Sequence, residues 1–114
     1  MDISHDDDQV NYDEANAVVT CRGSFRLHGG DAYQPILDLL ITAADSRAER
    51  LTLDVRELQF LNSSGINTLS KFILRVRKNQ SSQVVIQGSA QFPWQAKSLK
   101  NFQRLLPDLQ LDIG

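Results

Sequence analysis

The chain has 114 residues, the length of one domain, and its 41% hydrophobic and 23% charged residues are ordinary for a globular protein. The single cysteine, Cys21, excludes an internal disulfide, and no apolar stretch is long enough to span a membrane. The acidic first residues also lack the apolar run of a signal peptide, so we expect a cytoplasmic protein.

The two signs of charge are segregated along the chain. Residues 1–57 contain twelve acidic and five basic residues, whereas residues 58–107 contain seven basic residues and no acidic one. Such segregation favours oppositely charged faces that steer partners, although solvated lysines and arginines on helices also explain it. The pI of about 5.5 argues against a nucleic-acid-binding protein.

The first half of the chain predicts a tail, two strands and a helix. Residues 1–9 resemble a frayed acidic tail, which leaves residues 10–114 as the folded domain. Residues 10–12 favour a short edge strand, and residues 17–25 favour a longer one that contains Gly23. After a turn at 28–30, Asp31 is a plausible N-cap of a helix. The apolar residues of that helix recur at three- and four-residue steps: Tyr33, Ile36, Leu37, Leu40 and Ala44.

The second half predicts two more helices and three more strands. Residues 50–55 alternate as a strand, and residues 57–62 are expected to form an apolar connection. A second helix is expected from about Ser63 to about Asn79, buried through Ile66, Leu69, Ile73 and Val76. Residues 83–87 predict a buried strand, residues 95–106 a helix that ends at Pro107, and residues 109–111 an edge strand. This order predicts an α/β fold with a mixed four- to five-stranded sheet and helices largely on one face.

The most informative segment is Asn62-Ser63-Ser64-Gly65, which joins a predicted strand to the second helix. The start of a helix leaves about four N–H groups without partners and carries roughly half a positive charge, so it accommodates a phosphate. Ser63 is expected at this start with its hydroxyl outside the helix, and Ser64 is a candidate N-cap. Gly65 allows the backbone to approach its own strand or a partner. The four residues alone are also typical of an ordinary turn and helix cap.

The run from Phe60 to Ile66, FLNSSGI, together with the order of elements over residues 10–112, resembles the STAS domains of bacterial anti-sigma-factor antagonists. In that family an apolar pair precedes Asp-Ser-Ser/Thr-Gly at the start of the second helix. The resemblance implies a binding protein without enzymatic activity or cofactor, in which Ser63 accepts a phosphate, with Ser64 as the second choice. It also implies two partners: a serine kinase with a histidine-kinase-like ATPase fold and an opposing phosphatase of the PP2C type.

The sequence departs from the family pattern at Asn62, where the family has an aspartate. Asparagine forms hydrogen bonds but is a poor base, so either the kinase supplies the base or phosphorylation here is slow or lost. The Asn-Ser-Ser-Gly form also resembles STAS-only proteins that regulate other signalling enzymes, such as a diguanylate cyclase. The involvement of a sigma factor is therefore left open.

The expected switch follows from charge. A phosphoserine carries about −1.5 to −2 charges, and its burial in an interface without an arginine partner is costly. We therefore expect the unmodified chain to bind its partner and phosphorylation of Ser63 to release it. The expected contacts are the loop and basic positions of the second helix: Asn62, Ser63, Ser64, Gly65, Asn67, Lys71, Arg75 and Lys78. These basic residues suit an acidic partner, and the chain itself is expected to be a monomer or a weak dimer.

A small hydrolase or ligand-binding domain is the alternative of a different class. A nucleophile elbow requires Gly-x-Ser-x-Gly, which neither Ser63 nor Ser64 satisfies, and His28 is the only realistic base.

Three other features have plainer interpretations. His5 and the acidic residues 6–8 are more typical of a charged tail than of a metal site, so no metal is expected. Cys21 is expected to be a small core residue. The apolar run Phe92-Pro93-Trp94 is either an exposed contact or a lid over the core.

Overall fold

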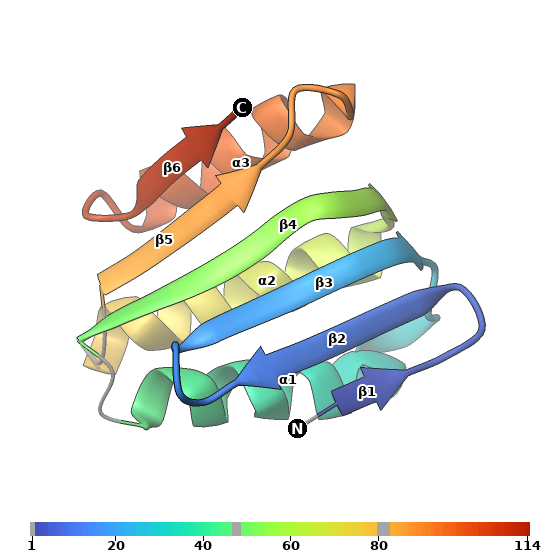
Figure 1. Cartoon of the computed structure of the whole chain (residues 1–114), viewed down its shortest axis with the longest axis horizontal. Helices are drawn as coiled ribbons and strands as arrows, with labels where there is room; N and C mark the ends of the chain where they lie inside the picture. Colours follow the sequence, from blue (N-terminus) through green and yellow to red (C-terminus); the bar gives the residue numbers. More distant parts are fainter. Residues whose placement is uncertain (1, 47–48, 80–82) are drawn as a thin grey trace.

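The computed structural model describes residues 2–46, 49–79 and 83–114, which form a six-stranded mixed sheet with three helices (Figure 1). The strands are β1 (Asp2–Ser4), β2 (Asp8–Asp13), β3 (Val18–Phe25), β4 (Arg50–Leu61), β5 (Gln83–Gly88) and β6 (Gln110–Ile113). The helices are α1 (Gly29–Asp45), α2 (Ser63–Asn79) and α3 (Pro93–Leu105). The predicted α/β class and mixed sheet are confirmed, with six strands in place of four or five.

The strands lie in the sheet in the order of the chain. β1, β2 and β3 are antiparallel neighbours, whereas β3, β4, β5 and β6 run parallel with one helix in each crossover. All three helices lie behind the sheet in the view of Figure 1. The carboxyl ends of β3, β4 and β5 therefore meet at one end of the sheet, where α1, α2 and α3 begin.

The hydrophobic core lies between the sheet and the helices because the side chains of β3 and β4 alternate. Val19 and Cys21 of β3 and Leu53 of β4 face the helices and are at most 4% exposed. Thr52 and Asp54 lie on the opposite, open face and are only half-buried. One face of the sheet is thus apolar and covered, and the other is polar and uncovered.

The predicted frayed tail is wrong for residues 2–9. β1 pairs with β2, and the side chain of Asp8 is buried beneath the β1–β2 turn, where His5 Nδ1 lies 2.7 Å from its Oδ1. The backbone N–H of Ser24 donates to the Asp7 carbonyl at 2.8 Å, which fixes the turn on β3. The acidic composition of these residues is typical of a tail, but in this hairpin the charged side chains lie mostly outward while Ile3 and Val10 pack inward.

Gly23 of β3 is required by that turn. It has a φ of +92°, a conformation that residues with a side chain rarely adopt, and a Cβ here would lie 2.1 Å from the Asp7 carbonyl oxygen. The glycine therefore allows the β1–β2 turn to pack directly against β3.

The prediction that residues 57–62 form a connection is also wrong, because β4 continues to Leu61. The β3–β4 register shifts between Thr20 and Arg22 and again between Gly23 and Ser24. Each shift inserts an extra residue into β4 and breaks its inside–outside alternation, so the apolar residues Leu58 and Leu61 are three positions apart. Irregular spacing of this kind is typical of a loop, and here it belongs to a bulged strand.

Helix α1 begins at Gly29, with His28 as its N-cap residue and without a side-chain cap. Asp31, the predicted N-cap, instead lies in the first turn, where its carboxylate suits the helix dipole. The predicted apolar face of this helix is buried as expected. Among the described residues, no helix is long and apolar enough to cross a membrane.

Candidate functional site

Asn62 fixes the point at which β4 becomes α2. Its Oδ1 accepts a hydrogen bond from the Gly65 N–H at 3.0 Å, and its own carbonyl accepts the Ile66 N–H at 2.9 Å. Asn62 is therefore the N-cap of α2, and the prediction that Ser64 serves as the N-cap is wrong. The asparagine side chain is short enough for an N-cap position, and its Oδ1 is the acceptor that this position needs.

The same amide joins α2 to two other elements. The Tyr33 hydroxyl on α1 donates to Asn62 Oδ1 at 2.7 Å, and Asn62 Nδ2 donates to the Leu27 carbonyl at 2.8 Å. In addition, the backbone N–H of Asn62 donates to the Phe25 carbonyl at 3.1 Å. Asn62 is thus a positioning residue that uses both its acceptor and its donor. An aspartate could accept the hydrogen bonds from Tyr33 and Gly65 but, when ionised, could not donate to Leu27.

Tyr33 is the buried part of this arrangement. Its side chain is 1% exposed, and burial raises the pKa of its hydroxyl above the usual value. The hydroxyl therefore stays protonated at neutral pH and remains a hydrogen-bond donor to Asn62. Helical periodicity marks Tyr33 only as a residue of the apolar face, so this hydrogen-bonding role is not visible in the sequence.

Gly65 allows the first turn of α2 to lie against both β4 and α1. A Cβ at this position would lie 2.3 Å from Leu61 Cδ1 and 2.9 Å from the Tyr33 hydroxyl. The predicted close approach of the Gly65 backbone is thus directed at its own strand and at Tyr33. A side chain here would displace the hydroxyl that positions Asn62.

The two serines differ in exposure. Ser63 is the first residue of α2 and is exposed, whereas Ser64 is half-buried and borders a groove between α1 and α2. Among the described residues, the Ser63 hydroxyl forms no hydrogen bond, and no hydrogen bond joins either serine to His28. Of the two, Ser63 is the hydroxyl that a modifying enzyme can reach more easily.

An exposed stripe runs along α2 from Ser63. Residues four apart lie on one side of a helix, which places most of the predicted contact residues in a single row. We call this row the α2 stripe; its members are Ser63, Asn67, Lys71, Leu74, Arg75 and Lys78, all exposed. Arg75 approaches Asp45 at 3.9 Å, whereas Lys71 and Lys78 pair with no carboxylate in the described part of the chain.

The groove beside the α2 stripe is small, and its exposed lining is more apolar than polar. It measures about 310 Å³ and is lined by Gly30, Ser64, Asn67, Thr68, Ser70 and Lys71, with Leu74 at one end. Leu74 is 45% exposed and is one of two exposed large hydrophobic residues in the described part of the chain. The stripe and groove thus combine one apolar side chain with unpaired positive charge and hydroxyl groups.

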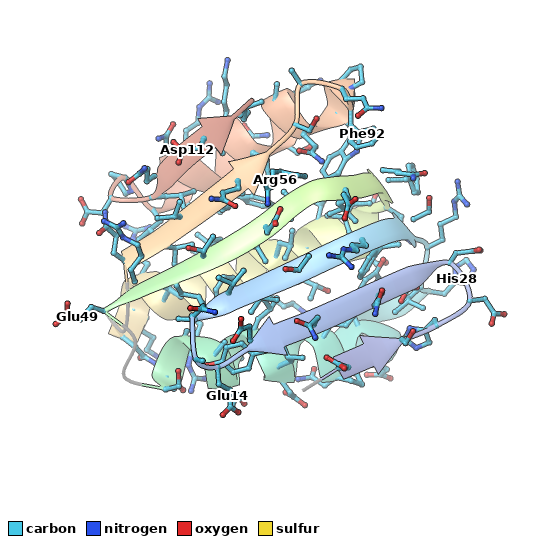
Figure 2. All side chains as sticks on the ribbon, in the orientation of Figure 1. Glu14, His28, Glu49, Arg56, Phe92 and Asp112 are labelled. Carbon is cyan, nitrogen blue, oxygen red and sulfur yellow. The ribbon has the colours of Figure 1, made fainter. Side chains whose placement is uncertain are left out.

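The run at 92–94 lies over the end of β4. β4 pairs with β5 only as far as Asp54, so the carbonyl groups further along β4 that face the β5 side have no ladder partner there. Trp94 Nε1 donates to the Gln59 carbonyl at 2.9 Å, and both Phe92 and Trp94 are half-buried. Figure 2 shows Phe92 at the same end of the sheet as His28. Phe92 and Trp94 therefore partly cover the end of β4, and neither is a fully exposed contact residue.

Gln95 completes this connection, and no local sequence pattern indicates its role. Its side chain is fully buried, and Nε2 donates to the carbonyls of Val55 at 2.7 Å and Leu58 at 2.9 Å. Its Oε1 accepts the Ser89 N–H at 2.8 Å. One glutamine therefore replaces the missing strand partners of β4 and holds the start of α3 against it.

Cys21 and His5 form no hydrogen bond with the side chains of Asn62, Ser63 or Ser64 among the described residues. Cys21 is buried in the core, and burial raises the pKa of its thiol to about 12. His5 belongs to the β1–β2 turn. Within residues 2–46, 49–79 and 83–114, no group of three or more His, Cys, Asp or Glu side chains could hold a metal ion.

Comparisons of the chain with protein-family models, with curated proteins and with solved structures found no match.

Proposed function

We propose that this chain is a protein-binding switch that is controlled by phosphorylation of Ser63. The observation that carries the proposal is the exposed Ser63 hydroxyl at the start of α2, at the head of the α2 stripe. The resemblance of residues 60–66 to the STAS signature supports the same serine. On this proposal, the chain acts in the cytoplasm as a regulator of an anti-sigma factor or of another signalling enzyme.

The start of α2 suits a phosphorylated serine. Asn62 satisfies the Gly65 N–H, and the N–H groups before it in the first turn have no partner within the helix. These groups and the helix dipole favour a phosphate on Ser63, so modification would be compatible with the fold.

The same phosphate would oppose a bound partner. A surface that packs closely on Ser63 and the α2 stripe would have to accommodate about −1.5 to −2 additional charges. A partner that offers carboxylates to Lys71 and Lys78 would also be repelled by the phosphate. Unmodified chain would therefore bind, and phosphorylated chain would dissociate.

The geometry of Asn62 bears on how the phosphate is transferred. Both ends of its amide are used in hydrogen bonds to Tyr33, Gly65 and Leu27, so it has no free group for proton transfer. On this proposal the kinase supplies the base, and Asn62 holds the serine in place. The kinase is expected to have a histidine-kinase-like ATPase fold, with a PP2C-type phosphatase opposing it.

The direct experiment is incubation with the histidine-kinase-like protein from the same genome and ATP, followed by mass spectrometry. We expect one phosphate on Ser63, retained in Ser64→Ala and absent in Ser63→Ala. Partner binding should be retained in Ser63→Ala and weakened in both Ser63→Asp and Ser63→Glu. Labelling on Ser64, or equal binding by all three Ser63 variants, would contradict the proposal.

A further inference from the structure

Phe60, near the end of β4, is turned outward by the second register shift. Gln59 and Phe60 are both exposed, because the extra residue in β4 interrupts the inside–outside alternation. In the described part of the chain, Phe60 and Leu74 are the exposed large hydrophobic side chains, at 40% and 45%. The second shift thus cancels the effect of the first, and the Phe60 ring is exposed as it would be on a regular strand.

Arg26, just beyond β3, covers part of this ring. Its guanidinium carbon lies 4.9 Å from the centre of the Phe60 ring, within the range of a cation–π contact. A guanidinium that stacks on a ring keeps its N–H groups directed outward in the plane, where they can bind a carboxylate through two hydrogen bonds. The contact with the ring thus orients the Arg26 guanidinium for binding to a carboxylate.

The other arginines of this surface are already paired. Arg22 Nε lies 2.8 Å from Glu57, and Arg56 forms two hydrogen bonds to Asp54, at 3.0 and 2.8 Å. Arg26 forms no ion pair with any described carboxylate, and residues 58–107 contain no acidic residue. The Arg26–Phe60 pair therefore places a positive charge next to an exposed aromatic ring, and no described carboxylate of the chain neutralises that charge.

The Arg26–Phe60 pair adjoins the candidate switch. The backbone N–H of Asn62 donates to the Phe25 carbonyl at 3.1 Å, so the residues after β3 lie beside the start of α2. The pair therefore lies at the same end of the sheet as Ser63.

We propose that Arg26 and Phe60 form a second docking point for an acidic segment of the partner, which rests on the proposed switch function. A carboxylate of the segment binds the outer N–H groups of Arg26, and an apolar side chain packs on the exposed part of Phe60. A nucleic acid fits this surface less well, because Arg22 and Arg56 are already paired and leave a single arginine for a phosphate backbone, which needs several adjacent cations.

The test is an NMR titration of the full chain with a short capped peptide, Asp-Glu-Leu-Asp-Glu. We expect saturable shifts of the Arg26 and Phe60 backbone amides. Binding should be weaker by about tenfold or more for the neutral peptide Asn-Gln-Leu-Asn-Gln, because it cannot form the charge-assisted bonds. Arg26→Gln and Phe60→Ser should each lose most of the binding, whereas the matched control Lys97→Gln on α3 should retain it.

Several outcomes would overturn the proposal. These are unchanged binding in Arg26→Gln and Phe60→Ser, shifts confined to α3, no shift up to the solubility limit, or tighter binding of a short oligothymidine through Arg26. Both variant positions are exposed, and a well-dispersed amide spectrum verifies that each variant is folded. The peptide titration involves neither the kinase nor Ser63, so its failure is separate from failure of the switch.

Discussion

Replacing Asn62 by alanine should destabilise the fold, because this side chain links the start of α2 to α1 and to the residues after β3. The change removes the N-cap acceptor of α2 and leaves the part-buried Tyr33 hydroxyl and Leu27 carbonyl without their partner. Loss of an asparagine N-cap costs about 1 kcal/mol. A buried polar group left unsatisfied costs about 1–3 kcal/mol.

Counting the cap and the Tyr33 hydroxyl alone, these terms predict that Asn62→Ala loses at least about 2–4 kcal/mol of unfolding free energy. At about 2.1 cal/mol/K per residue, the entropy of unfolding of 114 residues is about 0.24 kcal/mol/K, so a loss of 3 kcal/mol lowers Tm by about 12 °C. Asn62→Asp retains the acceptor for Tyr33 and Gly65 and loses only the donor to Leu27. Its stability should therefore fall between those of the wild type and the alanine variant.

The assay is urea unfolding followed by circular dichroism, with thermal melts as a second measurement. The matched control is Asn67→Ala, an exposed asparagine on the same helix, which should change stability by less than about 0.5 kcal/mol. A loss for Asn62→Ala no larger than for this control would show that the hydrogen bonds of Asn62 do not hold the start of α2. A changed m-value would instead indicate an altered denatured or native state.

Four further predictions follow from the contacts described above. Tyr33→Phe should lose about 1 kcal/mol, and combining it with Asn62→Ala should cost clearly less than the sum, because both remove one shared bond; additive losses in urea unfolding would contradict the coupling. Gln95→Leu should lose about 2–4 kcal/mol, since it leaves the carbonyls of β4 unpaired in the core; a neutral effect on Tm would refute that role. Gly23→Ala should lose about 2 kcal/mol or more through backbone strain and contact with the β1–β2 turn, and faster hydrogen exchange in that turn is the more specific readout. Cys21 should react with a disulfide reagent at pH 8 far more slowly in the native chain than in concentrated urea, because it is buried and its thiol pKa is raised to about 12; equal rates would contradict its burial.

The helices of this fold were the part most accessible to sequence reasoning. Apolar residues at three- and four-residue steps predict the buried face of α1, and the structure buries each of the five residues named for it. In α2, Leu69, Ile73 and Val76 are buried as predicted, Ile66 is only partly buried, and Phe72 joins them. Helical periodicity is a local property, so neighbouring residues are sufficient to reveal it.

The hydrogen bonds that position Ser63 were not accessible in the same way. Tyr33 and Leu27 lie 29 and 35 positions before Asn62 in the chain, and Gln95 reaches carbonyls 40 and 37 positions before it. No local pattern relates residues at such separations. The second half of β4 was missed for a related reason, since its bulges depend on the pairing with β3 and remove the alternation by which strands are recognised.

The strand order has a consequence for how the chain assembles during synthesis. No strand is inserted between two earlier ones, because the sheet grows from β1 to β6 in the order in which the ribosome releases them. Each new parallel strand therefore finds its neighbour already in place and has to close only the loop that contains one helix. Until β5 and α3 emerge, the end of β4 lacks Gln95 and the indole of Trp94. The β4 carbonyl groups that these side chains bind therefore have no protein partner at that stage. Completion of the switch region should thus be a late event, coupled to the docking of α3.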